Sequence, residues 1–105
     1  MFGTDTNMQQ ADRGNIRGRQ EEVACDCWFS STGRTIPRFI KYQDMTGVIH
    51  SIHDIRVIES ERQIRCGIPV VMYRCVAEEG GRQYRFRLFF HLEDCQWKVV
   101  WEGTD

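Results

Sequence analysis

The chain has 105 residues, of which 41% are hydrophobic and 11% aromatic, and its formal net charge is −1. This length suits one domain with a modest core and is too short for two. The near-neutral charge argues against a protein that binds nucleic acid by bulk electrostatic attraction.

The first twenty residues contain no apolar run long enough for a secretory signal, and no later stretch is long and apolar enough to cross a bilayer. The five cysteines are an odd number, which favours reduced thiols over a disulfide framework. These patterns predict a cytoplasmic protein without a membrane partner.

Residues 1–22 are predicted to form a flexible tail, and residues 23–105 a single small β domain. The tail is polar, and Ile16 is its one interior aliphatic residue, so it has little apolar surface to offset the entropy of ordering. A second interpretation makes the tail a basic arm for a partner, built from Arg13, Arg17 and Arg19.

In the first half of the domain, strands are predicted at 24–30, 36–44 and 48–58, separated by glycine-containing turns. In the third segment the apolar residues change face, because Val48 and Ile52 fall at even positions whereas Ile55 and Val57 fall at odd positions. This shift predicts a bulge or bend near His53 and Asp54.

Residues 59–67 are predicted to form a short helical turn. Ser60 and Gln63 have the spacing of a capping box, and Gly67 suits the end of such a turn. A 3₁₀ turn or a loop is the alternative.

The second half of the domain has the clearest pattern. Strands at 68–77, 84–92 and 97–101 carry large apolar residues at every second position. Pairing Glu79 with Arg82 sets Tyr73 opposite Leu88 and Cys75 opposite Phe86. For the last hairpin, pairing Glu93 with Gln96 sets Leu92 opposite Trp97 and Leu88 opposite Trp101, which keeps one face apolar.

The predicted fold is all-β: a six-stranded antiparallel meander with at most one short helical turn. Such a sheet must cover its apolar face, and a strongly bent sheet or a small barrel of the SH3-like or OB-like kind does so while limiting exposed edges. A two-sheet sandwich is the alternative architecture.

Cysteines and histidines supply two candidate chemical sites. Cys25 and Cys27 could ligate zinc with a third and fourth ligand brought in by folding, but their one-residue gap is unusual for zinc and favours core packing, as for Cys75. The run His50, His53 and Asp54 could act in acid–base chemistry, although no nucleophile or metal motif accompanies it. We therefore predict no catalytic set and no cofactor.

The outward face of the late strands is the main candidate binding surface. Arg74, Arg85 and Arg87 share this face with Phe89, and Arg74 is predicted to lie opposite Arg87 with Glu102 relieving the repulsion. Exposed arginine and aromatic residues are typical of protein-binding hot spots. A weaker candidate is the turn Gly33-Arg34-Thr35, whose amides and guanidinium could hold an anion.

The sequence thus predicts a small non-catalytic binding or accessory module acting through Arg74, Arg85, Arg87 and Phe89. Its partner would be an unidentified protein or a second copy of the chain. Single-stranded nucleic acid on the same face is an alternative, because an aromatic residue among arginines can stack bases. A zinc or thiol site at Cys25 and Cys27 is another.

Overall fold

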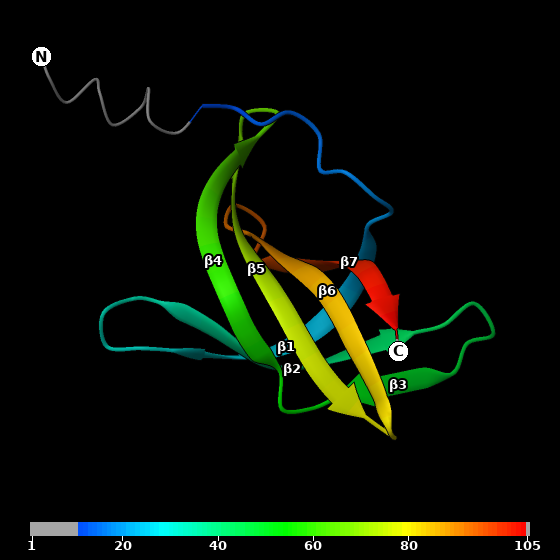
Figure 1. Ribbon diagram of the computed structural model, residues 1–105. Helices are drawn as coiled ribbons and strands as arrows, with labels where there is room; N and C mark the ends of the chain where they lie inside the picture. Colours follow the sequence, from blue (N-terminus) through cyan, green and yellow to red (C-terminus); the bar gives the residue numbers. More distant parts are fainter. Residues whose placement is uncertain (1–10, 105) are drawn as a thin grey trace, which may run out of the picture.

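The computed structural model describes residues 11–104, and within that range the chain forms seven β-strands and no helix (Figure 1). The strands are β1 (Glu21–Phe29), β2 (Thr35–Gln43), β3 (Ile49–Ile52), β4 (Arg56–Arg65), β5 (Ile68–Glu79), β6 (Arg82–His91) and β7 (Gln96–Thr104). The prediction of an all-β antiparallel protein is confirmed. The predicted number of strands is wrong by one, because the segment 48–58 divides between β3 and β4.

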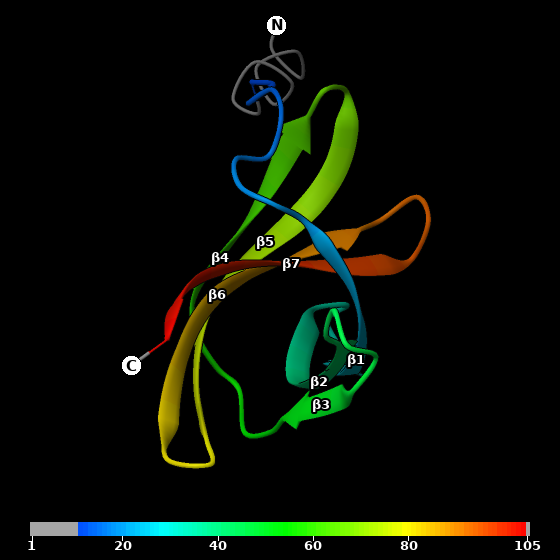
Figure 2. The ribbon, with the colours of Figure 1, turned by 90° about the vertical axis from the view of Figure 1, so that its right-hand side faces the viewer.

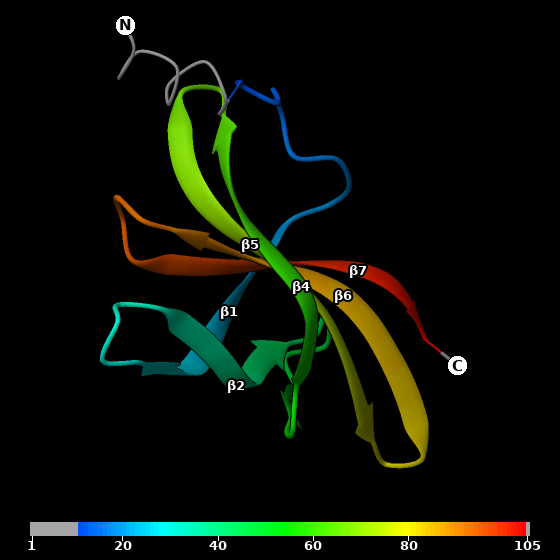
Figure 3. The same cartoon turned by 60° about the vertical axis from the view of Figure 1, so that its left-hand side comes forward.

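The strands form one antiparallel sheet in the order β3-β2-β1-β7-β6-β5-β4. β1 joins its two halves: Glu21–Val23 pair with β7, and residues 24–29 pair with β2. Figures 2 and 3 show the strands β1–β3 as a group beside the strands β4–β7. The two ends of the sheet, β3 and β4, are not paired with each other, so the predicted barrel is wrong, and the sheet is not strongly curled.

The sheet stays open because β3 is short. Its four residues pair only with Ile40–Gln43 of β2, which leaves the first half of β2 without a strand on that side. A single backbone hydrogen bond, from Ile55 N to Arg38 O at 3.1 Å, links the end of this gap to the segment before β4.

One face of the sheet carries the main core. Side chains from both halves share a single buried cluster, in which Ile40 of β2 and Ile52 of β3 join residues of β5, β6 and β7. The latter are Tyr73, Cys75, Ala77, Phe86, Leu88, Phe90, Trp97 and Val99. The period-two pattern of the late strands therefore predicted the buried face correctly.

The hairpin between β5 and β6 has the predicted register. Glu79 lies opposite Arg82, Tyr73 opposite Leu88 and Cys75 opposite Phe86. Gly80 and Gly81 both have positive φ, as a tight two-residue turn between twisted strands requires.

The hairpin between β6 and β7 differs from prediction by two residues. Phe90, not Leu92, lies opposite Trp97, and His91 lies opposite Gln96. The turn is longer because it spans 92–95, with Cys95 at φ 55°. A shift of two residues preserves the face of every side chain, so the apolar pattern alone could not distinguish the two registers.

The predicted helical turn at 59–67 is wrong. Residues up to Arg65 belong to β4, which pairs with β5 as far as Arg65 opposite Ile68. Cys66 and Gly67, at φ 52° and 79°, make the two-residue turn. Continuous pairing with β5 outweighs the local capping preference of this segment.

The predicted break near His53 and Asp54 is confirmed, since β3 ends at Ile52, β4 begins at Arg56 and Asp54 has φ 54°. The break is anchored from β5: Oε1 of Glu79 lies 3.0 Å from the backbone N of His53 and 3.2 Å from its Nδ1. This connection takes the chain from one end of the sheet to the other.

Candidate functional site

The predicted arginine face exists on β4–β7, and its charges are largely compensated. Arg74 lies opposite Arg87 as predicted. The Nε of Arg74 is 2.9 Å from Oε1 of Glu59, and the Nε of Arg87 is 2.9 Å from Oε2 of Glu102. The other carboxylate oxygen of Glu102, Oε1, lies 3.6 Å from Nη1 of Arg74. Glu102 therefore relieves the repulsion between the two arginines, although it is Val100 that lies opposite Arg87.

Phe89 is fully buried, with 0% of its surface exposed, so its predicted exposure is wrong. It belongs to a second buried cluster on the outward face, together with Val70, Met72 and Val100. Ile16 from the N-terminal segment packs against this cluster. The aromatic platform that single-stranded nucleic acid would need on this face is therefore covered.

Residues 12–18, which we call the N-terminal strap, cross the outward face of β4–β7. At one end, the carboxylate of Asp12 accepts hydrogen bonds from the backbone N of Cys66 at 2.9 Å and of Gly67 at 2.6 Å. A hydrogen bond from the backbone N of Gly14, together with these two, lowers the pKa of Asp12 below its usual value, because the bonds stabilise the charged form. Arg13 adds a backbone bond to Ile64 O at 2.7 Å and an ion pair with Glu61 at 2.8 Å.

At its other end the strap lies on β6 and β7. The carbonyl of Arg17 accepts a hydrogen bond from Nη2 of Arg87 at 2.8 Å. Gly18 has φ 98°, and a Cβ built there would lie 2.7 Å from Cγ1 of Val100. Residues 1–10 of the predicted tail lie outside the described residues, and the mobility of residues 1–22 stays a prediction.

Gly18→Ala is expected to destabilise the protein more than Gly14→Ala. Both glycines have positive φ, so alanine brings a backbone penalty of about 1–2 kcal/mol at each. Only at Gly18 does the new methyl group also meet a buried side chain, which adds about 1–3 kcal/mol, whereas nothing lies within 4 Å of Gly14. Urea unfolding of both variants and hydrogen exchange at the Arg13 amide measure the difference. Equal losses would contradict seating of the strap on Val100.

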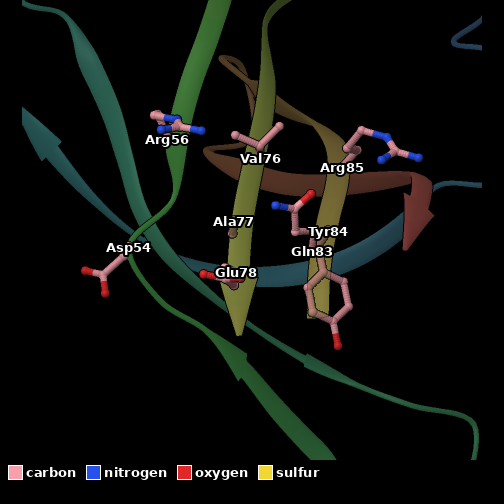
Figure 4. A pocket seen from close by; sticks show the side chains of 8 residues that line it. All are labelled: Asp54, Arg56, Val76, Ala77, Glu78, Gln83, Tyr84 and Arg85. Carbon is pink, nitrogen blue, oxygen red and sulfur yellow. The ribbon is translucent and has the colours of Figure 1, made fainter. Parts of the chain in front are cut away.

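The part of the outward face that the strap leaves open is polar. Arg56, Val76 and Arg85 lie side by side on β4, β5 and β6 (Figure 4). They help to line a shallow hollow of about 430 Å³ with Asp54, Ala77, Glu78, Gln83 and Tyr84. Sequence reasoning did not include Arg56 in this face. The signal was present, because Ile55 and Val57 are apolar and flank Arg56, so alternation along a strand turns Arg56 to the opposite, outward face.

A second hollow, which we call the β2–β4 groove, opens on the opposite side of the sheet, at the gap left by β3. Its volume is about 590 Å³, and it lies between the start of β2 and the strands β4 and β5. It is lined by Gly33, Arg34, Thr35, Ile36, Val57, Ile58, Glu59, Ser60, Arg62, Val71 and Tyr73. The turn Gly33-Arg34-Thr35, singled out in the sequence as an anion site, thus forms one wall of this groove.

Large apolar side chains are exposed around the β2–β4 groove. Ile36 and Ile58 line it and are 36% and 56% exposed. Trp28 lies opposite Ile36 in the β1–β2 pair and is 56% exposed, and the neighbouring Phe29 is 61% exposed. The sequence could not separate these residues from core residues, because their exposure depends on where the β1–β2 hairpin extends beyond the sheet.

The cysteine candidates lie in or against the core. Cys75 is buried, and Cys25 and Cys27 pack against the main cluster, as the core interpretation predicted. Burial raises the pKa of Cys25 and of Cys75 to about 12, which keeps both thiols protonated and unreactive. Within residues 11–104 no three His, Cys, Asp or Glu side chains are placed to hold a metal ion.

The two candidate histidines have separate acidic partners, neither of which is Asp54. Nε2 of His50 lies 2.7 Å from Oδ2 of Asp44, and His53 contacts Glu79. The other oxygen of Asp44 accepts bonds from Thr46 and Val48, and together these bonds hold its pKa well below the usual range. The structure thus uses both histidines to fix turns and does not bring them together with Asp54.

The chain has no match among known protein families, curated proteins or solved structures. In the part of the chain that the structure describes, there is no helix of the length and apolarity needed to span a membrane.

Proposed function

We propose that this protein is a small non-catalytic binding module that recognises another protein at the β2–β4 groove. The observation that carries the proposal is the exposure of Ile36 and Ile58, which line the groove, together with that of Trp28, which lies opposite Ile36 on β1. Exposed apolar residues that gather beside a hollow are typical of protein-binding surfaces, and aromatic residues supply much of the binding energy there.

The groove supports this role better than the arginine face does. On the arginine face, Phe89 and Met72 are buried, and Arg74 and Arg87 already have acidic partners within the chain. A partner would have to displace these ion pairs or the strap. The groove offers apolar side chains that burial against a partner would remove from water.

Selection of a displayed random-peptide library on the immobilised protein tests the proposal. We expect enriched peptides whose Kd rises about tenfold or more in the double variant Trp28→Ser/Ile36→Ser, a loss of about 1.4 kcal/mol or more. Met45→Ser/Val48→Ser is the matched control, since these residues are 91% and 53% exposed on the β2–β3 turn, and it should leave the Kd unchanged.

Arg85→Ser separates the two candidate surfaces. It changes the arginine face without touching the groove, and we expect an unchanged Kd. A Kd that depends on Arg85 and not on Trp28 and Ile36 would place recognition on the arginine face and overturn the assignment to the groove. Failure to enrich any peptide would overturn the proposed function itself.

A further inference from the structure

The free edge of β4 forms one side of the β2–β4 groove. β4 is the last strand of the sheet, so no strand of residues 11–104 pairs with its outer edge. The strap bonds to that edge only near its end, where Ile64 O accepts from Arg13 N at 2.7 Å. Because main-chain groups alternate between the two edges of a strand, those of Ser60 and Arg62 point the same way as those of Ile64.

The opposite side of the groove is also a strand edge. Arg38 O accepts from Ile55 N, which shows that the main chain of Arg38 points away from β1. Ser30 N donates to Arg34 O at 2.8 Å, so the main chain of Arg34 points toward β1, and by alternation the main-chain groups of the next residue, Thr35, point to the groove side. β3 reaches only as far as Ile40, so it does not cover them. The groove is therefore bounded by two strand edges with main-chain donors and acceptors turned toward it.

The side chains of the groove are apolar on its floor and basic at its rim. Val57, Val71 and Tyr73 line the floor beside the exposed Ile36 and Ile58. Arg34 and Arg62 line the rim, and neither forms an ion pair with a described residue, whereas Glu59 is already paired with Arg74. The rim thus has a net positive charge toward a partner.

We infer that the occupant of the β2–β4 groove is an extended peptide segment of a partner protein, which adds as a strand to the edge of β4 at Ser60–Arg62. Its alternate side chains are apolar and pack on Tyr73 and Ile36. An acidic side chain or a terminal carboxylate of the segment meets Arg34 and Arg62. This mode of recognition draws affinity from main-chain hydrogen bonds and specificity from alternate side chains. The inference rests on the proposed function, whose site it makes specific.

A scan of single N-methyl groups along an enriched peptide tests strand addition. Each N-methyl group removes one main-chain donor, so we expect Kd to rise about tenfold at every second residue and to change little at the residues between. Uniform tolerance of N-methylation would overturn strand addition. The proposed function would survive that result, provided that Trp28→Ser/Ile36→Ser still raises the Kd about tenfold or more.

Charge reversal tests the predicted acidic partner. The double variant Arg34→Glu/Arg62→Glu should lose peptides with an acidic residue and enrich basic ones in a repeated selection. Lys41→Glu, an exposed change elsewhere on β2, is the matched control and should keep the original preference. Unchanged enrichment in the double variant would exclude contact with these arginines.

Sedimentation of the protein alone distinguishes a second copy from a different partner. We expect a monomer at micromolar concentration. A dimer that Trp28→Ser/Ile36→Ser converts to monomer would show that another copy occupies the groove, and would overturn the inference of a partner peptide.

Discussion

Phe89→Ala is expected to reduce the free energy of unfolding by about 3–5 kcal/mol. The ring has 0% exposed surface and lies among Val70, Met72 and Val100, so truncation removes its burial and leaves a cavity. For a domain of this size such a loss is a large share of the total stability. Urea unfolding followed by tryptophan fluorescence measures it.

Phe29→Ala is the matched control for this prediction. Its ring is 61% exposed, so its removal should change stability by no more than about 0.5 kcal/mol. The alternation of polar and apolar residues in the sequence predicts the opposite for Phe89, because it places that ring on the outward face. A small effect of Phe89→Ala would therefore favour an exposed face and an undocked strap.

Ile40→Ala is expected to cost about 2–5 kcal/mol and to leave a single unfolding transition. Ile40 belongs to β2, and its side chain is 0% exposed because it is buried in the same cluster as the residues of β5–β7. The two halves of the sheet should consequently unfold together. Coincident transitions by circular dichroism and by tryptophan fluorescence would show this cooperativity.

The control for Ile40→Ala is Ile49→Ala, because Ile49 on β3 is 67% exposed and contributes little buried area. Its effect should stay within about 0.5 kcal/mol. A biphasic transition in the Ile40 variant would mean that β1–β3 and β4–β7 are separate folding units, contrary to the shared cluster.

The candidate groove was only partly accessible to sequence reasoning. The turn that contains Arg34 and the strand that contains Tyr73 were both identified from local patterns. Their proximity depends on β1, which pairs with β7 at its start and with β2 at its end. No local pattern encodes that pairing, because Glu21 and Val99 are far apart in the chain.

The arginine face shows a different limit. Strand parity correctly placed Arg74, Arg85, Arg87 and Phe89 on one face, yet it could not say what covers that face. The polar composition of residues 12–18 argued for a tail, whereas the structure anchors them through the carboxylate of Asp12 and the close approach of Gly18 to Val100. Such contacts depend on single atoms and leave no periodic signal.

The sequence by itself determined the all-β class, the buried face of the late strands and the register of the β5–β6 hairpin, because side-chain alternation and a two-residue glycine turn are local properties. Tertiary structure alone decided that 59–65 is a strand, that Phe89 is buried and that the sheet stays open at the β2–β4 groove. Each of these depends on long-range pairing or packing, whose energy outweighs the local preferences of the segments involved.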